Sequence, residues 1–169
     1  QTVQHKNIRR IDVTSAGEMH DACLDNFKDS EIVVMSAAVA DYRPRHTSSF
    51  KIKKSSHDLT IELEPTADIL AEMGNAKREG QILAGFALET GEGIENARRK
   101  LQKKNLDLIV LNSLKDEGAG FGKETNKVTI LSPDGIIHSG ELKQKSQVAA
   151  DIMDVICGIM KTRPETHVV

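Results

Sequence analysis

Short apolar runs alternate with stretches of helical periodicity along most of this chain. The runs have the length of strands and lie at residues 8–13, 31–35, 59–63, 82–88 and 106–111. Four stretches show helical periodicity. The first follows a capping box of Ser15 and Glu18, the second begins at Pro65-Thr66, and the third covers residues 92–104. The last has the apolar stripe Val148, Ile152, Val155, Ile156 and Ile159. This alternation predicts an α/β fold with a mostly parallel sheet covered by helices.

A β-hairpin is expected late in the chain. Residues 127–131 and 136–138 are strand-like and flank the turn sequence Ser-Pro-Asp-Gly at residues 132–135. In a parallel sheet, ligands bind beyond the carboxyl ends of the strands. The loops that follow residues 35, 88 and 111 are therefore the places where functional residues are expected.

Length and charge narrow the class of protein. With 169 residues, of which 38% are apolar, the chain suits one compact domain rather than two. Its 23 basic and 25 acidic side chains nearly balance, whereas nucleic-acid binders normally carry a basic excess. No apolar run approaches the ~18 residues of a membrane helix, and residues 1–10 do not resemble a signal peptide. We therefore expect a cytoplasmic domain without nucleic-acid or membrane partners.

Several common catalytic devices are absent from the sequence. It contains no P-loop, no H-E-x-x-H motif and no G-x-S-x-G motif, and its six histidines are scattered. Cys23 and Cys157 stand alone in helix-like patterns, so both are expected to be buried packing thiols. The glycine-rich segment 118–122 precedes a strand, whereas a dinucleotide fingerprint precedes a helix, so a flexible loop is predicted there.

Two segments could contact a ligand, and each also has a plain structural interpretation. Residues 35–44 have the sequence M-S-A-A-V-A-D-Y-R-P, in which small side chains would let a ligand approach the backbone and Asp41 is the first charge. Residues 50–54 have the sequence F-K-I-K-K; if this segment is extended, Lys51 and Lys53 share a face that suits phosphate oxygens. The alternatives are a tightly packed turn and a solvated surface.

Three further side chains have a similar choice of roles. Phe86 follows a glycine in the strand-like sequence A-G-F-A-L-E-T, so it is either a core residue or the wall of a pocket for a planar base. Lys100 and Lys104 lie one turn apart on a predicted helix. Their mutual repulsion is relieved either by solvent, as on an ordinary helix face, or by a bound anion.

The order of these motifs is more specific than any one of them. Along the chain they are A-A-V-A-D-Y-R-P, K-I-K-K, G-F-A-L-E-T, K-N-L-D-L-I-V-L-N and F-G-x-E-T-N-x-V-T-I. Over residues 10–158 this series closely resembles phosphopantothenoylcysteine synthetase, the ligase domain of the bacterial coenzyme A biosynthesis flavoprotein. The resemblance implies a three-layer Rossmann-like fold with helices on both faces of the sheet, and a homodimer.

The same resemblance implies a two-step ligation. The carboxylate of 4'-phosphopantothenate attacks the α-phosphate of CTP, which releases pyrophosphate and forms an acyl-cytidylate. The amine of L-cysteine then displaces CMP, and Mg²⁺ is the implied cofactor. Such a reaction needs positioning and charge neutralisation more than a protein nucleophile. The lack of a familiar catalytic motif is consistent with this chemistry.

Family positions can be carried over onto matching residues of this chain. Lys51 matches the lysine implicated in forming the acyl-cytidylate and is the implied catalytic residue. The implied nucleotide-binding residues are Ser36, Ala37, Asp41, Lys51, Ala67, Asp68, Ile69, Leu70, Phe86, Lys100 and Lys104. Asp68 falls at the start of a predicted helix, whose backbone groups can bind a base edge. No metal ligand is assigned, because Mg²⁺ commonly rides on phosphates.

The chain also departs from the family pattern. Family members carry a further N-terminal segment with an asparagine needed for turnover of the acyl-cytidylate, and residues 1–14 do not match it. We therefore expect residues 1–169 to be a single ligase-like domain without this segment. A flavin-dependent decarboxylase, often fused upstream in the family, is a candidate partner, and no FMN site is expected here. The alternative function is a non-catalytic nucleotide-binding or dimerisation fragment; a dinucleotide-dependent oxidoreductase lacks the required glycine fingerprint.

Overall fold

The computed structural model describes residues 5–54, 58–89, 93–113 and 122–162, which form two compact units. Unit 1 contains the described residues up to Lys28 together with Ala38–Ile69, and unit 2 contains Asp29–Ala37 and the described residues from Leu70 onward. Within these ranges, no helix combines the length and the apolar character that spanning a bilayer requires.

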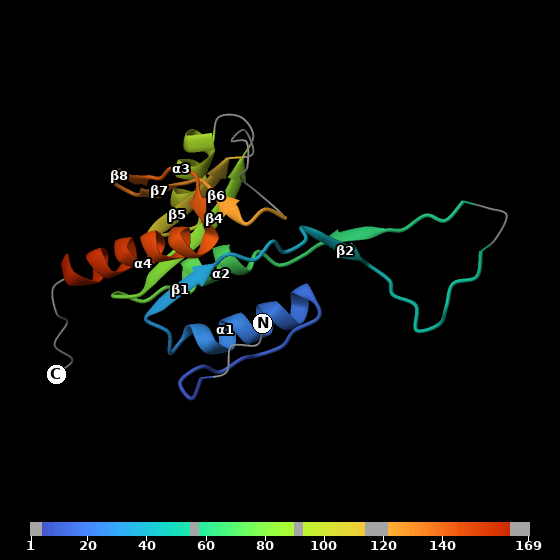
Figure 1. Cartoon of the computed structure of the whole chain (residues 1–169). Coiled ribbons are helices and arrows are strands. Elements are labelled where there is room, and N and C mark those ends of the chain that lie inside the picture. Colours follow the sequence, from blue (N-terminus) through green and yellow to red (C-terminus); the bar gives the residue numbers. More distant parts are fainter. Residues whose placement is uncertain (1–4, 55–57, 90–92, 114–121, 163–169) are drawn as a thin grey trace. The chain divides into compact units, whose positions relative to one another are not determined.

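Unit 2 is built on a five-stranded sheet in the order β1-β4-β5-β7-β8. The strands are β1 (Ile32–Met35), β4 (Ile82–Glu89), β5 (Leu108–Ser113), β7 (Val128–Ser132) and β8 (Gly135–Ser139). The first three run parallel, whereas β7 and β8 pair antiparallel and form the expected late hairpin (Figure 1). The sheet is therefore mixed, and its parallel part, β1, β4 and β5, is the part where the site is expected.

One face of this sheet is covered by α4 (Lys145–Thr162). Strand and helix side chains meet there in one buried cluster, which consists of Ile82, Ala84, Leu108, Val110, Val128, Ile130, Val148, Ile152 and Ile156. Val155 and Ile159 pack against the cluster and are partly buried. The apolar stripe predicted for the last helix is therefore confirmed.

The opposite face is covered by α2 (Ile69–Ala76) and α3 (Gly93–Lys103). A Cβ on the first residue of α3 would lie 3.4 Å from the Leu111 side chain of β5. Leu70 of α2 lies over Gly85 of β4, where a Cβ would come within 2.7 Å of its Cδ2. Helices thus cover both faces, and the three-layer α/β fold is confirmed.

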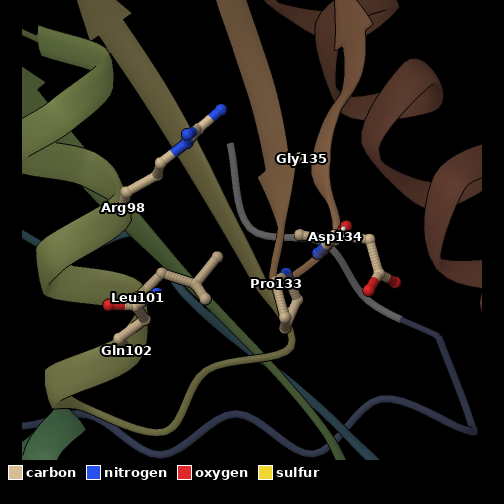
Figure 2. Close-up of a pocket in the computed structure, with 7 residues that line it drawn as sticks. Arg98, Leu101, Gln102, Pro133, Asp134 and Gly135 are labelled. Carbon is tan, nitrogen blue, oxygen red and sulfur yellow. Dashed lines mark hydrogen bonds between the residues drawn. The ribbon is translucent and has the colours of Figure 1, made fainter.

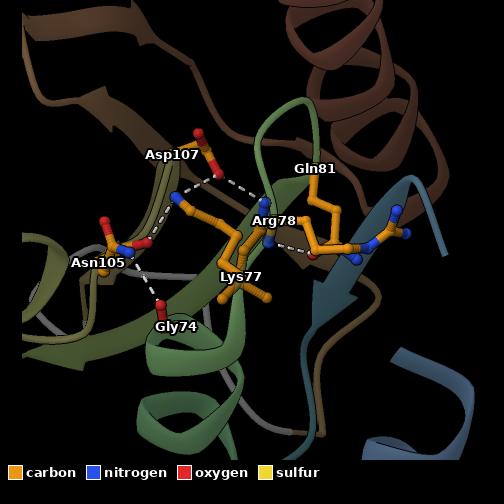
Figure 3. Close-up of polar contacts among 7 residues, drawn as sticks. Gly74, Lys77, Arg78, Gln81, Asn105 and Asp107 are labelled. Atoms are coloured by element: carbon orange, nitrogen blue, oxygen red, sulfur yellow. Dashed lines mark hydrogen bonds and ion pairs between the residues drawn. The ribbon is translucent and has the colours of Figure 1, made fainter. Parts of the chain in front are cut away.

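A polar network holds the amino ends of β4 and β5 (Figure 3). Asp107 Oδ2 accepts hydrogen bonds from Lys77 Nζ at 3.0 Å and from the Leu83 N–H at 2.8 Å. Lys77 Nζ also donates to Asn105 O at 2.7 Å, and Asn105 Nδ2 donates to Gly74 O at 2.8 Å. Asn105 has a φ of 51°, the left-handed conformation that commonly ends a helix. These contacts tie α2 to the turn after α3, and so serve the fold.

Unit 1 contains α1 (Ala16–Phe27), which begins at the predicted capping box. Ser15 Oγ accepts a hydrogen bond from the Glu18 N–H at 3.1 Å. The Glu18 carboxylate in turn accepts from the Thr14 N–H at 2.6 Å and from Thr14 Oγ1 at 2.8 Å. The backbone bond from Thr14, followed by its hydroxyl bond, holds the pKa of Glu18 below its ordinary value.

Four short strands complete the fold. In unit 1, β2 (Tyr42–Pro44) and β3 (Leu63–Pro65) form a two-stranded antiparallel sheet. In unit 2, β6 (Thr125–Asn126) and β9 (Lys143–Gln144) pair antiparallel beside the start of α4. The strand β2 was not predicted, because its Arg-Pro sequence favours a polar loop.

Three other local predictions were wrong. Residues 8–13 form no strand, because apolar alternation makes a strand only where a neighbouring strand pairs with it. Residues 59–62 are likewise outside any strand, and β3 begins at Leu63. Pro65 ends β3 instead of starting a helix, and α2 begins only at Ile69. Proline fits this strand because it lies at a position of the ladder that needs no N–H donor.

The prediction for the cysteines was also wrong in part. Cys157 is exposed, since it follows Ile156 of the buried stripe and therefore points about 100° away around the helix. Cys23 is half-buried, and burial raises the pKa of its thiol. Both are free thiols. The predicted flexible loop at residues 118–122 lies almost entirely outside the described residues.

Candidate functional site

The carboxyl edge of the parallel strands in unit 2 is stepped. β1 ends at Met35, which pairs with Gly85, whereas β4 and β5 continue together for four more residue pairs. Ser36 and Ala37, two of the predicted residues, follow β1 and are exposed. The step therefore leaves one side of the last part of β4 without a neighbouring strand from β1.

Lys100 of α3 reaches this step. The Ile82 N–H donates to Glu31 O, so the backbone groups of the even-numbered residues of β4 face β1. By this alternation the Phe86 carbonyl faces the side that β1 leaves open, and Lys100 Nζ donates to it at 3.2 Å. The ring of Phe86 is half-buried against the α4 cluster. Two predicted site residues are thus in direct contact, and Phe86 also belongs to the core.

Lys104 occupies the next turn after Lys100. Its backbone N–H donates to Lys100 O at 3.0 Å, and its side chain is half-buried. Its carbonyl lies against Gly74, where a Cβ would come within 1.9 Å of the oxygen. The backbone of Lys104 therefore adjoins the polar network at the amino end of the strands.

The second predicted segment, residues 67–70, surrounds the start of α2. Ala67 and Asp68 are exposed, and Asp68 immediately precedes the helix, where aspartate is a favoured N-cap residue. The Ile69 side chain is buried, and the Leu70 side chain packs over Gly85. Leu70 is half-buried, so Ala67 and Asp68 are the two accessible residues of this segment.

In unit 1, the β2–β3 ladder brings Asp41 close to the second segment. Arg43 lies opposite Glu64, and Arg43 Nε donates to Glu64 Oε1 at 2.8 Å. Two positions further along the ladder, beyond Tyr42 and Pro65, the Thr66 N–H donates to Asp41 O at 2.9 Å. Asp41 and Ala67 are thus held near one another by main-chain pairing, although they are far apart in sequence.

Lys51 lies on the connection between β2 and β3, residues 45–62, which we call the arm. Lys51 and Lys53 are exposed, and residues 51–54 have no regular secondary structure. The predicted site residues therefore divide between the units. Asp41, Lys51, Ala67, Asp68 and Ile69 belong to unit 1, and Ser36, Ala37, Leu70, Phe86, Lys100 and Lys104 belong to unit 2.

The carboxylates among the described residues indicate how the implied Mg²⁺ could be held. No group of three or more His, Cys, Asp or Glu side chains among the described residues could hold a metal ion. Asp41 and Asp68 are the carboxylates among the predicted positions. This donor set fits a Mg²⁺ ion carried mainly by phosphate oxygens and water, rather than one held in a protein cage.

One polar residue at the same edge was missed. Asn112 lies near the end of β5, opposite Leu88 of β4 and Val128 of β7. Its Oδ1 is buried and has no hydrogen-bond partner among the described residues. Sequence reasoning passed over it because it ends an apolar run; a lone amide in such a run is the signal that could have found it.

A small pocket lies elsewhere in unit 2 (Figure 2). It has a volume of about 130 Å³ and is lined by Arg98, Leu101 and Gln102 of α3 and by residues 132–135 of the hairpin turn. Leu131 pairs with Ile109, so this turn lies beyond the amino end of β5. The pocket contains none of the predicted residues and is at the edge where parallel sheets do not usually bind ligands.

Comparison with known proteins identifies the family. Residues 1–160 match the model of the DNA/pantothenate metabolism flavoprotein C-terminal domain. The chain belongs to this family. It is 44% identical to the coenzyme A biosynthesis bifunctional protein CoaBC of Bacillus subtilis (strain 168) over 92% of its own length. It is also 53% identical over 88% of its length to a cysteine/cysteine sulfinic acid decarboxylase from an unknown prokaryotic organism.

The chain spans 38% and 41% of the lengths of these two relatives. Among solved structures, the C-terminal domain of CoaBC matches with a TM-score of 0.72 and 37% identity, over 90% of this chain and 68% of that one. A Cab2 mutant in complex with phosphopantothenate-cysteine has a TM-score of 0.61 and 16% identity, over 89% of this chain and 54% of that one. The last likeness shows the shared fold alone. These matches confirm the resemblance and the Rossmann-like fold class.

Proposed function

We propose that this chain is the ligase domain that joins 4'-phosphopantothenate to L-cysteine in coenzyme A biosynthesis, with CTP as co-substrate. The observation that carries the proposal is the 44% identity to a CoaBC protein over 92% of the chain. The contact of Lys100 with Phe86 at the stepped edge of the sheet supports it, since a cation is fixed where α/β folds bind nucleotides.

In the proposed first step, the carboxylate of 4'-phosphopantothenate attacks the α-phosphate of CTP. The two reactants are anions, so the protein must neutralise charge and hold the reacting atoms in line. Lys51 would stabilise the charge that develops on the α-phosphate, and Lys100 and Lys104 would hold the nucleotide. Mg²⁺ carried by the phosphates would supply further positive charge. Pyrophosphate leaves, and an acyl-cytidylate remains.

In the proposed second step, the amine of L-cysteine attacks the acyl carbon of this intermediate. The bond from that carbon to the CMP oxygen breaks, CMP leaves, and an amide forms. The nucleotide would be held through both steps by the backbone of residues 36, 37 and 67–70, together with the carboxylates of Asp41 and Asp68. Ala67 and Asp68, which precede α2, are exposed and suit this role.

The arm supports the proposal of a homodimer. Its large apolar side chains are exposed: Phe50 is 84%, Ile52 63%, Leu59 66% and Ile61 60% accessible. Four such side chains on one connection are costly to leave in water, at about 25 cal/mol for each Å² of apolar surface. A second copy of the chain that packs against the arm would cover them.

A decarboxylase is the proposed further partner, as a fused domain or a separate protein. The names of both curated relatives described above are consistent with this, since one is bifunctional and the other is called a decarboxylase. The alternative function, a nucleotide-binding or dimerisation fragment without activity of its own, is consistent with the 38% share of the CoaBC relative that the chain spans.

Isothermal titration of the 169-residue chain with CTP and with ATP, each with Mg²⁺, tests nucleotide recognition. Saturable heat with CTP and none with ATP is the expected result. Equal binding of both would contradict the choice of CTP. Binding of CTP by this chain, without product formation by the full-length protein, would favour the non-catalytic alternative.

A further inference from the structure

The ladder between β2 and β3 continues beyond both strands. Its hydrogen-bonded positions pair Arg45 with Glu62, Arg43 with Glu64, and Asp41 with Thr66. The two prolines, Pro44 and Pro65, fall at the intervening positions, where an antiparallel ladder needs no N–H donor. This explains how a proline-rich pair of segments sustains a regular ladder that ends at Thr66.

Thr66 makes two hydrogen bonds at this end of the ladder. Its N–H donates to Asp41 O at 2.9 Å, and its Oγ1 donates to Ala40 O at 2.6 Å. The hydroxyl bond is the shorter of the two and lies at the short end of the usual range. Thr66 therefore binds the two consecutive carbonyls of Ala40 and Asp41, which belong to the first predicted nucleotide-binding segment. It also directly precedes Ala67, the first residue of the second segment.

The charge pattern along the ladder gives Thr66 a second effect. Residues on one face of an antiparallel ladder alternate, so Asp41, Arg43 and Arg45 share a face with the residues opposite them. Arg43 Nε lies 2.8 Å from Glu64 Oε1, and Arg45 Nη1 lies 3.5 Å from Glu62 Oε2, so each arginine forms an ion pair with the residue opposite it. Opposite Asp41 the sequence has the neutral Thr66 instead of a cation. Thr66 thus fixes the backbone of Asp41 without engaging its carboxylate in an ion pair.

We propose that Thr66 is a positioning residue that joins the two nucleotide-binding segments, residues 36–41 and 67–70, and keeps the Asp41 carboxylate available to the nucleotide. This inference rests on the proposed function. Because both segments would hold the nucleotide before and during the reaction, loss of the hydroxyl should weaken nucleotide binding and leave the chemical step nearly unchanged.

Thr66→Val and Thr66→Ser in the full-length protein test the proposal, with KM for CTP, KM for L-cysteine and kcat as readouts. The Val variant keeps the shape and loses the hydroxyl, so we expect KM for CTP to rise about fivefold, with KM for L-cysteine and kcat changed by less than about twofold. The Ser variant keeps the hydroxyl and should restore KM for CTP. Thr129→Val, on β7, is the matched control for loss of a threonine hydroxyl.

Each outcome bears on the proposal. If the Val variant keeps the wild-type KM for CTP, or if the KM values for CTP and L-cysteine rise together, Thr66 has no positioning role. If the Val variant does not fold, Thr66→Ala replaces it. An Ala variant with the same KM for CTP as the Ser variant overturns the inference. A wild-type protein that forms no product with CTP overturns the proposed function and this inference with it, whereas an active wild type with an unchanged Val variant overturns the inference alone.

Discussion

At the scale of single residues, Lys100 is a proposed nucleotide-binding residue whose side chain also contacts the sheet. Its ammonium donates to the Phe86 carbonyl at 3.2 Å, which orients a long and otherwise mobile side chain. An ammonium has three donors, so this contact is compatible with contacts to phosphate oxygens. Sequence pattern alone could place Lys100 on a helix, but its contact with β4 depends on the packing of α3 on the sheet.

Lys51→Gln should lower formation of the acyl-cytidylate by roughly 10²–10³ while the fold is unchanged. The side chain is exposed on the arm, so its loss removes a charge and little packing. The measurement is single-turnover formation of the intermediate by the full-length protein. Lys53→Gln is the matched control on the same arm and should stay within about twofold of wild type. Equal losses in both variants would show a general effect of charge.

At the scale of helices and strands, periodicity predicted the elements that pack in the core. The strands β1, β4, β5 and β7 and the helices α3 and α4 were predicted within a few residues, because apolar side chains on their packed faces set their period. α1 and β8 are mostly exposed or half-buried, and they were predicted from the capping box and from the hairpin turn. The ladder of β2 and β3 was missed or misplaced because it is exposed and depends on long-range pairing and ion pairs. Predicting this ladder would have required knowing that residues 42–44 and 63–65, which are distant in sequence, pair with each other.

Gly85→Ala should destabilise unit 2 by about 1–3 kcal/mol. The new Cβ would come within 2.7 Å of Leu70 Cδ2 and 2.9 Å of Leu106 Cδ1, so these two buried or half-buried side chains must repack. Chemical denaturation measures the change. Gly158→Ala on α4 is the control: nothing lies within 4 Å of that Cβ, and the helix should gain about 0.5–1 kcal/mol. An undiminished stability in the Gly85 variant would contradict the packing of α2 described above.

Glu18→Gln should lower the thermal stability of α1 at neutral pH. The pKa of Glu18 is lowered in the folded state by the bonds from Thr14, so the ionised group stabilises the fold above its unfolded pKa. This contribution is lost as the pH falls through the lowered, folded pKa. Circular dichroism melts should therefore show the variant below wild type at neutral pH and equal to it in acid. A difference that persists in acid would assign the effect to shape instead of charge.

At the scale of the whole molecule, the order of five motifs was sufficient to predict the family, which the match over residues 1–160 confirms. The α/β class was predictable because buried strands and helical stripes alternate. The distribution of the site residues over two compact units was not, since single-residue matches carry no information on which parts of a chain pack together. Whether residues 1–169 act as a single domain stays a prediction.

Phe50→Glu should convert the proposed dimer into a monomer. An exposed arm phenylalanine that a second copy covers would become a buried charge, which is strongly unfavourable. Sedimentation velocity measures the change, with Phe50→Leu as the apolar control that should remain dimeric. A wild-type chain that sediments as a monomer at micromolar concentration would contradict the proposal for the arm.

The most direct test of the central proposal is product formation by the full-length protein. It should be incubated with 4'-phosphopantothenate, L-cysteine, Mg²⁺ and CTP, and the products should be identified by mass spectrometry. The expected products are phosphopantothenoylcysteine, CMP and pyrophosphate in equal amounts, and an acyl-cytidylate when L-cysteine is omitted. Absence of the amide, or formation of CDP and phosphate in place of CMP and pyrophosphate, would contradict it.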